Sequence, residues 1–451
     1  MAQGTRLTEM ARDQFPNGVL IGGENSREAI QLTKDAIAAG AAVIFEAAFF
    51  VDGQYARVDV LTKLPGRKPK WKVTEVKSSL ELKPDKHLPD LAFQVYVVQR
   101  SGLEVTDASV ITLNRDFRHG RDDAPLFAES PAWKFLRKAL KKIEPAIEAA
   151  RSVEQADSAP VIEVGRHCRS PYECPFLEHC RSSLPARHIS WIPRIKKPQE
   201  EHLREAGVTT YDRLPDDFDA TALQWRFIRG ECEGERYIGD RLRETLESLA
   251  YPIAFIDFEA VQPGLPVIKG TAPYERIPFQ WSCHLMSHPE HEWQHREFLA
   301  HPEGDSRERF AETLLEAIHD AATVMYYSPY EPATVEGLVQ AGVPFAIDVQ
   351  DVLRERGVDL LELVQEHLYL PQFQGRFSIK KVLPALVPGF DYGDLTIQGG
   401  DLAALTYYRM LQGSHPSPEE AREALRRYCE RDTEAMVRVF QAMRTLAFEA
   451  G

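Results

Sequence analysis

Four charged residues in the N-terminal part of the chain could hydrolyse a phosphodiester bond with the help of a metal ion. Glu46 and Asp59 lie in two apolar stretches joined by an Asp-Gly pair, which is a strong signal for a two-residue hairpin turn. Counting back from that turn places Glu46 opposite Asp59, where like charges destabilise a sheet unless a cation lies between them. Glu75 and Lys77 are two residues apart and therefore share one strand face. The carboxylates would hold Mg²⁺ or Mn²⁺, and Lys77 would orient or help to deprotonate the attacking water.

The segments around these residues resemble a known nuclease core. RVDVL, TEVKSS and DLAFQVYVVQ are similar to the PD-(D/E)XK core of the RecB-like exonucleases. The resemblance implies that Asp59 and Glu75 bind the metal, that Lys77 is catalytic and that Gln94, on the following helix, assists at the nucleic acid. Tyr96 lies on the same predicted helix and either contributes to nucleic-acid binding or packs. The alternative, which assigns these charges no function, is that they all lie on a solvated sheet face.

A second acidic set occurs in the C-terminal half. Residues 253–256 are a continuous apolar run, typical of a buried strand, and the run ends in Asp257 and Glu259. Period two places both carboxylates on the same side of that strand. Glu331 comes just after another short strand, predicted at 322–327. The alternative for Asp257 and Glu259, which assigns them no function, is a strand end exposed to water.

The last acid of this set belongs to a long helix predicted over 419–446. Its apolar stripe passes Tyr428 and Asp432, which are four residues apart. A carboxylate that faces a core is costly unless it is paired or bound to a metal, so Asp432 needs a partner. That partner would be a metal ion or an arginine such as Arg427 or Arg431.

Taken in order, these acids resemble the DEDD exonucleases of the ribonuclease H-like superfamily, in the subtype with Tyr-x-x-x-Asp as its last motif. The resemblance implies two metal ions held by carboxylates and a tyrosine that positions the water. It departs from the usual pattern at one acid, where Glu stands in place of Asp and YYSPYE lacks the customary Asn. Lys380, in FSIKKVLPAL, is expected to contact a phosphate. The residues that the resemblance assigns to catalysis are Asp257, Glu259, Glu331, Tyr428 and Asp432.

A cysteine cluster separates the two acidic sets. Cys168, Cys174 and Cys180 fall within CRSPYECPFLEHC, and prolines prevent one continuous helix there. Such a cluster in a cytoplasmic chain indicates zinc or an iron–sulfur cluster rather than disulfides, with buried free thiols as the alternative. Several RecB-like nucleases hold a 4Fe–4S cluster through three cysteines after the core and one before it. No cysteine precedes Cys168 here, so the fourth ligand would be His167, His179 or a water.

Several elements must position these residues. Short apolar runs predict strands, and 3.6-residue periodicity predicts helices. Helices are expected over 26–39, 88–99 and 131–151, and strands over 45–51, 54–61, 71–77, 108–113 and 279–286.

Composition places limits on the whole. A chain of 451 residues with 43% hydrophobic residues is globular and exceeds one comfortable core. No stretch approaches the roughly 20 apolar residues that span a membrane, and the N-terminus lacks a signal-peptide core, so we expect a cytoplasmic protein. The net charge of −14 counts against a broad phosphate-binding surface, although basic residues gather at 63–72 and 134–142.

We therefore expect an α/β protein in three parts. Residues 1–185 would form a PD-(D/E)XK, restriction-endonuclease-like domain with the cysteine cluster, 186–248 a helical linker, and 249–451 a ribonuclease H-like domain. This arrangement resembles a bacterial family of unknown function that joins two such domains. The expected activity is Mg²⁺- or Mn²⁺-dependent hydrolysis of nucleic acid, DNA rather than RNA, from its ends. The alternatives are a nucleic-acid-binding scaffold with one decayed nuclease domain, and a ribonuclease that acts through the C-terminal site.

Overall fold

The computed structural model describes residues 2–170 and 172–449, and the chain divides into two compact units. Unit 1 runs to Leu177 and includes Pro263–Glu275, while unit 2 comprises Glu178–Gln262 and the chain from Arg276 onward. The segment 186–248, expected to be a linker, is thus grouped with unit 2, and the connection at 263–275 is grouped with unit 1. Within the described residues, every helix is too short or too polar to cross a membrane.

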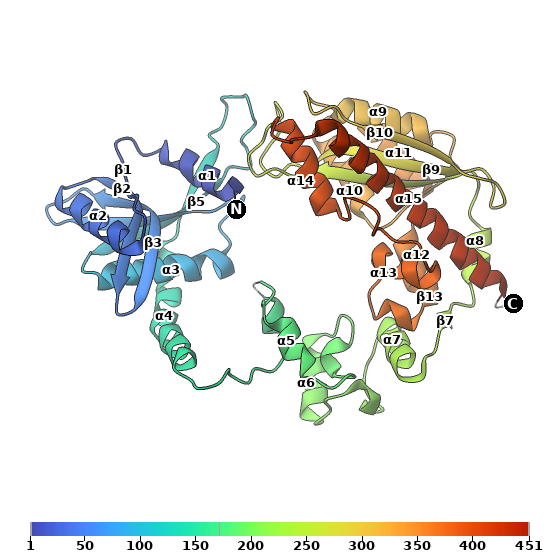
Figure 1. The fold of residues 1–451 in the computed structure, drawn as a ribbon, viewed down its shortest axis with the longest axis horizontal. Coiled ribbons are helices and arrows are strands. Elements are labelled where there is room, and N and C mark those ends of the chain that lie inside the picture. Colours follow the sequence, from blue (N-terminus) through green and yellow to red (C-terminus); the bar gives the residue numbers. More distant parts are fainter. Residues whose placement is uncertain (1, 171, 450–451) are drawn as a thin grey trace. The chain divides into compact units, whose positions relative to one another are not determined.

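Unit 1 contains a six-stranded mixed sheet with its strands in sequence order, β1 to β6 (Figure 1). Neighbouring strands are antiparallel except for the parallel pairs β1–β2 and β4–β5. The elements of this unit are α1 (Ala2–Arg12), β1 (Val19–Leu20), α2 (Ser26–Ala38), β2 (Val43–Val51), β3 (Gln54–Leu64), β4 (Lys70–Val76), α3 (Pro84–Arg100), β5 (Val105–Leu113), β6 (Phe127–Pro131), α4 (Trp133–Glu154) and the 3₁₀ turn η1 (Arg166–Arg169).

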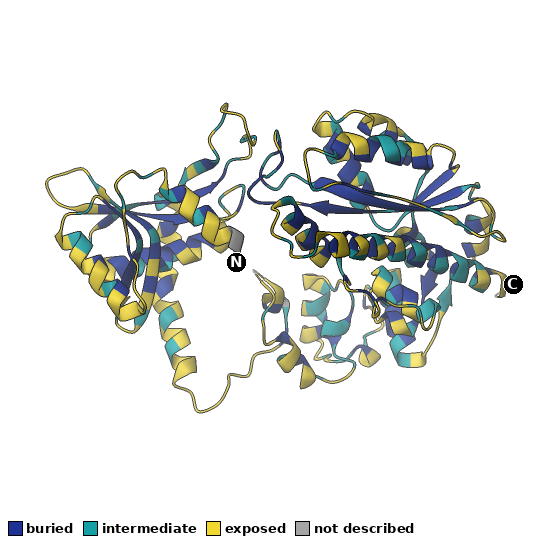
Figure 2. Cartoon of the chain, turned by 45° about the horizontal axis from the view of Figure 1, so that its top comes forward, coloured by how far each residue is buried: buried dark blue, intermediate teal, exposed yellow. Residues whose placement is uncertain are grey.

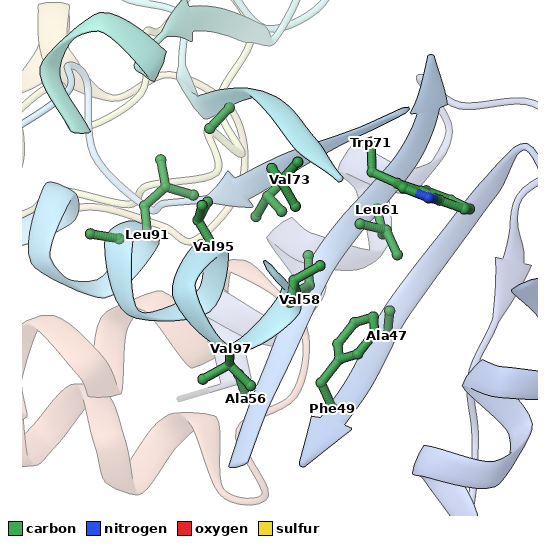
Figure 3. Close-up of a cluster of buried hydrophobic side chains, with 14 of the residues drawn as sticks. Ala47, Phe49, Ala56, Val58, Leu61, Trp71, Val73, Leu91, Val95 and Val97 are labelled. Atoms are coloured by element: carbon green, nitrogen blue, oxygen red, sulfur yellow. The ribbon is translucent and has the colours of Figure 1, made fainter. Parts of the chain in front are cut away.

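Both faces of this sheet are covered. On one side, which we call the α3 face, apolar residues of α2, α3 and α4 pack against the strands. Figure 3 shows Val58 and Val73 of the sheet beside Leu91 and Val95 of α3. On the other side, the α1 face, Leu7 of α1 and segment 263–275 cover a second core. The sheet is therefore the centre of a layered α/β unit.

The hairpin between β2 and β3 forms at the predicted register. Asp52 and Gly53 both have positive φ, 50° and 84°, as a type I′ turn requires, and Val51 pairs with Gln54. Further along, both strands change face at the same level. Phe45 contributes to the α1-face core and Ala47 to the α3-face core, because Glu46 between them has a φ of +56°. The partner strand changes face in the same way around Asp59.

Unit 2 contains a five-stranded sheet in the order β10-β9-β8-β11-β12, in which β8, β11 and β12 are parallel, and a two-stranded ribbon of β7 and β13. Its elements are α5 (Leu177–Ser182, at the boundary), η2 (Ile189–Trp191), α6 (Lys197–Glu205), η3 (Tyr211–Arg213), α7 (Ala222–Glu233), β7 (Tyr237–Ile238), α8 (Leu242–Glu247), β8 (Ile253–Val261), β9 (Ile277–Met286), β10 (Gln294–Leu299), α9 (Arg307–Ile318), β11 (Thr323–Tyr326), α10 (Tyr330–Gln340), α11 (Ala346–Arg356), β12 (Gly357–Asp359), α12 (Leu360–His367), β13 (Leu368–Tyr369), η4 (Pro371–Phe373), α13 (Ile379–Leu386), α14 (Gly400–Leu411) and α15 (Pro418–Glu449).

The central strands of unit 2 are buried along nearly their whole length (Figure 2). Alternate residues of β8 and β9 pack against α9, α10 and α11 on one face. The remaining residues face α14 and α15, where Phe255 meets Phe440 and Phe279 stacks on Tyr407. The apolar stripe predicted for the last helix is confirmed, because all six of its residues are at most 1% exposed: Leu425, Cys429, Met436, Val439, Phe440 and Met443.

The elements predicted from sequence are present within a few residues of their expected ends. The mixed α/β class is likewise confirmed, with a large sheet at the centre of each unit and helices against both faces of that sheet.

Candidate functional site

In unit 1, the candidate site forms where β3 separates from β4. The two strands pair as far as Val60 and Thr74, and the next residues in register are Asp59 and Glu75. β4 continues beside β5 beyond this point, so its edge toward β3 becomes free. The Asp59 carboxylate fills the gap, accepting a hydrogen bond of 2.7 Å from the backbone N–H of Val76. The fork therefore brings both predicted carboxylates to one place.

Lys77 and helix α3 complete this cluster. The Lys77 ammonium lies 2.7 Å from Glu75 Oε1 and also contacts the carboxylate of Asp90. The Gln94 amide donates to Glu75 Oε2 at 2.7 Å and to Asp90 Oδ1 at 3.3 Å. Asp90 is absent from the sequence prediction, although its position four residues before Gln94 on a helix was a usable signal.

The electrostatics of this cluster favour a bound cation. Burial, followed by neighbouring negative charge, raises the pKa of Asp59 to about 6 and that of Glu75 to about 8. Burial opposes charge on Lys77 too, but the adjacent Glu75 and Asp90 outweigh it and raise the lysine pKa. One ammonium, that of Lys77, thus lies among the three carboxylates of Asp59, Glu75 and Asp90. These oxygen ligands fit a divalent cation, which would balance the remaining negative charge.

Glu46 lies near this cluster but has partners of its own. Its carboxylate is 2.9 Å from Arg12 and 3.0 Å from Arg57. The expected like-charge conflict with Asp59 is therefore relieved by two guanidinium groups, and a metal ion is not needed for that purpose. Arg12 comes from α1, which sequence reasoning could not place beside this strand. The Glu46 charge still contributes to the raised pKa of Asp59, after burial.

Tyr96 does not join the site. Its hydroxyl donates to Glu144 of α4 at 3.3 Å, and its ring packs beside the α3-face core. Of the two roles considered for Tyr96, the structure supports packing.

In unit 2, the candidate site lies between β8 and α15. One carboxylate oxygen from each of Asp257, Glu259 and Asp432 lies within 4.8 Å of the others. Asp257 and Glu259 share the face of β8 that α15 covers, as the period-two argument predicts. Glu259 and Asp432 are buried, and Asp257 is partly buried.

Glu331 supplies a fourth carboxylate. It lies in the first turn of α10, is 2% exposed, and its charge acts on Asp257. Its Oε2 atom is buried and has no hydrogen-bond partner among the described residues. A buried carboxylate oxygen without a donor is costly, and a cation would remove that cost.

Asp432 is surrounded by phenols rather than guanidinium groups. Tyr392 donates to its Oδ1 at 2.6 Å, and a hydrogen bond from Tyr428 also acts on it. The arginines considered as partners are engaged elsewhere, Arg427 with Glu423 and Arg431 with Asp394. The salt-bridge alternative for Asp432 was therefore wrong. Tyr392 was missed, because it lies in a loop with no periodic pattern.

The carboxylates of this site all hold protons more tightly than usual. Burial is the first cause in each case, and neighbouring carboxylates add to it for Asp257, Glu259 and Glu331. The pKa of Glu259 rises to about 8. The pKa of Asp432 is also raised by burial, against the two tyrosine hydrogen bonds and the charge of Lys380. Four acids of this kind fit one or two divalent cations with oxygen ligands.

Lys380 places a positive charge beside the acidic cluster, as a residue that contacts a phosphate would. Its ammonium lies 4.9 Å from the ring centre of Tyr392 and 5.4 Å from that of Tyr428. It also donates to the backbone carbonyl of Gln398 at 2.5 Å. Next to it begins α14, where a Cβ on Gly400 would lie 3.5 Å from Glu259 Oε2. Positive charge is therefore available at the edge of the acidic cluster.

The cysteine cluster divides between the two units. Cys168 is buried, and its sulfur lies 3.5 Å from Nε2 of His167. Cys174 donates its backbone N–H to the Cys168 carbonyl at 2.7 Å, which closes a tight loop. Cys180 is grouped with unit 2, and all three thiols are free. A metal at these cysteines stays a prediction.

The second acidic set falls largely within a region that other proteins share. A family model described as a domain of unknown function (DUF2779) matches residues 254–378. This range contains Asp257, Glu259 and Glu331 and ends before α13. No curated protein matches the chain. Among solved structures, the family B DNA polymerase from the hyperthermophilic archaeon Pyrobaculum calidifontis is similar at 14% identity and a TM-score of 0.28, over 42% of this chain and 24% of that polymerase. The similarity thus spans about a quarter of the polymerase chain.

Proposed function

We propose that this chain is a metal-dependent nuclease, with a ribonuclease H-like exonuclease site in unit 2 and a PD-(D/E)XK site in unit 1. The observation that carries the proposal is the convergence of one carboxylate oxygen each from Asp257, Glu259 and Asp432 within 4.8 Å. Nearby, Oε2 of Glu331 has no hydrogen-bond partner in the part of the chain that the structure describes. Acids that are buried together without a cation repel one another, so the arrangement makes chemical sense as a metal site.

The donor set supports Mg²⁺ or Mn²⁺ in this role. All four ligands would be carboxylate oxygens, which hard divalent cations prefer. A bound divalent ion supplies Lewis acidity and a hydroxide-like water, which is the chemistry that phosphodiester hydrolysis needs.

The remaining residues of unit 2 would orient the substrate and hold protons. Tyr392 fixes Asp432 by donating to it, and Tyr392 and Tyr428 both favour its ionised form against the effect of burial, which still raises its pKa. Their own pKa values are raised by burial and by the nearby acids, so both remain donors at neutral pH. Lys380, whose side chain is exposed, would attract a phosphate.

In unit 1, Asp59 and Glu75 would hold the metal while Lys77 acts as a fixed ammonium. With its pKa raised, Lys77 is a donor that orients the attacking water or the phosphate rather than a base in the metal-free site. Gln94 would hold Glu75 in place, and Asp90 would hold Lys77.

The surface of unit 1 supports a nucleic-acid substrate. Helix α4 carries exposed basic side chains beside Phe135, which is 61% exposed. A row of cations next to an exposed aromatic ring suits a phosphate backbone and a base. DNA is our preferred substrate, as the resemblance implies. The basic residues of this row are Lys134, Arg137, Lys138, Lys141 and Lys142.

We also propose that Cys168, Cys174 and Cys180 bind zinc or a 4Fe–4S cluster. His167, already 3.5 Å from the Cys168 sulfur, is the preferred fourth ligand. Metal and sulfide analysis of anaerobically purified protein tests this, beside Cys174→Ser. A chain that carries neither metal would leave the cysteines as free thiols.

The nuclease proposal is tested with the full chain and end-labelled single- and double-stranded DNA and RNA in Mn²⁺. We expect Lys77→Ala to remove cleavage by unit 1 and Asp257→Asn to remove cleavage by unit 2. Matched controls are Lys70→Ala on the same strand as Glu75, and the exposed Asp320→Asn.

Each outcome distinguishes one candidate. If both variants cut every substrate as fast as the parent, the proposal is wrong. Binding without cleavage by the parent would favour a scaffold. RNA cleavage that only Asp257→Asn removes would favour a ribonuclease.

A further inference from the structure

Two histidines of unit 2 face each other on neighbouring strands. His284 of β9 pairs directly with His295 of β10, and their ring centres are 4.7 Å apart. Glu430 of α15 approaches the same point, with its Oε1 3.6 Å from Nδ1 of His295. One donor atom from each of the three residues lies within 4.8 Å of the others. Neither the nuclease proposal nor the sequence prediction uses any of them.

The two imidazoles are oriented by a chain of hydroxyl groups. Ser282 lies 2.9 Å from Nε2 of His295, and Thr433 lies 2.8 Å from Nδ1 of His284. The two hydroxyls also bond to each other at 2.7 Å. Each ring is therefore held through one nitrogen, and the other nitrogen is available to a ligand. Histidines that bind metals are usually fixed in this manner by a polar group behind the ring.

Two arginines of α15, one on each side of Glu430 along the helix, are paired with other acids. Arg426 pairs with Glu297 at 3.1 Å, and Arg438 pairs with Glu434 at 2.6 Å. Glu430 is about half exposed, so solvent and ions can reach the cluster from that side.

We propose that His284, His295 and Glu430 form a transition-metal site, separate from the carboxylate site and suited to zinc. Two imidazole nitrogens and one carboxylate oxygen are a ligand set that Zn²⁺ accepts, with a water in the fourth position. The carboxylate site, by contrast, offers oxygen alone and suits Mg²⁺ or Mn²⁺. The two sites would therefore take different metals from the same solution.

Such an ion would join the β9–β10 hairpin to α15 at a sensitive place. Glu430 lies between Tyr428 and Asp432 in the helix, and Thr433 directly follows Asp432. Zinc would hold this turn of α15 in position over β8. Its role is thus to position residues of the neighbouring site rather than to contact the substrate.

The test is a zinc-binding measurement on the full chain. Protein is dialysed against a buffered free Zn²⁺ concentration that just saturates the parent, with excess Mg²⁺ present to occupy oxygen-only sites, and bound zinc is counted per chain. We expect His295→Gln and Glu430→Gln each to bind one zinc ion fewer than the parent. The cysteine cluster contributes equally to all variants, so it cancels in the difference.

Two control variants change residues that lie close to the three ligands in the chain but are not ligands themselves. His291→Gln changes a histidine in the β9–β10 connection, and Glu434→Gln changes the next turn of α15. Both should bind as much zinc as the parent. Ser282→Ala should weaken the site about 10–100-fold without removing it, because it removes a hydroxyl that orients His295 and leaves all three ligands in place.

Equal zinc in the parent and in both ligand variants would overturn the proposal and leave a hydrogen-bonded His–Glu pair. If His295→Gln fails to fold, Glu430→Gln still decides, since its side chain is about half exposed. Because the readout is bound zinc, the result stands whether or not the chain cleaves nucleic acid.

Discussion

The carboxylate of Asp432 illustrates how a single residue can be made ready for a metal. It is buried, which raises its pKa, yet two phenol hydroxyls donate to it and lower that pKa again. An arginine partner would have neutralised the acid and competed with a cation. Phenols stabilise the ionised form and leave the negative charge in place.

Replacing Tyr392 by Phe should weaken metal binding in a pH-dependent way. The change keeps the ring and removes the 2.6 Å hydrogen bond to Asp432. The pKa of Asp432 then rises further, so the carboxylate stays protonated to a higher pH and Mn²⁺ must displace that proton. A hydrogen bond to a charged group contributes about 1.5–3 kcal/mol, so we expect about tenfold or more weaker Mn²⁺ binding at pH 7.

Thermal stabilisation of the full chain by Mn²⁺ measures this affinity. Tyr408→Phe is the matched control, because among the interactions described Tyr408 bonds only to the exposed Gln412, directly after the same helix. Raising the pH to 8.5 should restore part of the loss. Equal affinity for parent and Tyr392→Phe at both pH values would contradict the role given to Tyr392.

Asp59 allows a comparable test in unit 1. Asn can still accept the hydrogen bond from Val76, so Asp59→Asn should keep the fold while removing a metal ligand. We expect cleavage assigned to unit 1 to fall at least a hundredfold, with an unchanged or slightly higher unfolding temperature because a buried charge is lost. Asp107→Asn, on β5 of the same sheet, serves as the control. Undiminished cleavage would exclude Asp59 from catalysis.

At the scale of elements, the sequence predicts what is local and periodic. The hairpin register, the shared face of Glu75 and Lys77, and the apolar stripe of α15 all follow from spacing alone. The contacts it missed join residues whose spacing carries no period. Tyr392 reaches Asp432 from a loop, and Arg12 reaches Glu46 from another helix. Which loop or helix end lies against a site is decided by packing, and a single sequence contains no local signal for that.

Helix α15 carries both a buried apolar stripe and two residues of the carboxylate site, so its packing determines where those residues lie. Phe440 is fully buried and meets Phe255 edge to face with ring centres 5.5 Å apart. Phe440→Ala should therefore destabilise unit 2 by roughly 3–5 kcal/mol through the lost apolar contact and the cavity left behind. Mn²⁺ binding at the carboxylate site should weaken as well, because Tyr428 and Asp432 lie on the same helix.

The control for that change lies two turns further along. Phe448 is 41% exposed, so Phe448→Ala should cost far less stability. Chemical denaturation of both variants gives the comparison. A loss of similar size for the two would mean that α15 does not depend on its buried stripe.

For the whole molecule, two acidic clusters in one chain should make stability depend on pH and metal together. Glu75 in unit 1 and Glu259 in unit 2 each have a pKa raised by burial to about 8. In the unfolded chain both would release their protons near pH 4.3. Between these values the folded protein binds more protons than the unfolded one, so its stability must fall as the pH rises.

The window from pH 6.5 to 8 isolates this effect. Burial lowers the pKa of His87 and of His284, and their contribution, which has the opposite sign, is complete by about pH 7. Asp59, with a pKa of about 6, has largely ionised below the window. Lys77 keeps its proton throughout, because its pKa is raised. The buried acids therefore dominate the pH response here, because burial raises the pKa of Asp257, Glu331 and Asp432 as well as that of the two glutamates.

We expect the metal-free full chain, held in chelator, to lose several degrees of melting temperature between pH 6.5 and 8. Mn²⁺ should reverse the trend, since it binds the ionised carboxylates and displaces their protons. Glu75→Gln and Glu259→Gln should each remove part of the metal-free decline, and the double variant a larger part, while Asp257, Glu331 and Asp432 keep the rest. Glu81→Gln, which changes an exposed acid of unit 1, should leave the decline as it is in the parent. A flat profile for the metal-free parent, or an undiminished decline in the double variant, would show that these two acids ionise freely in the folded protein. The buried acids would then need no cation, and the strongest argument for metal at either site would be lost.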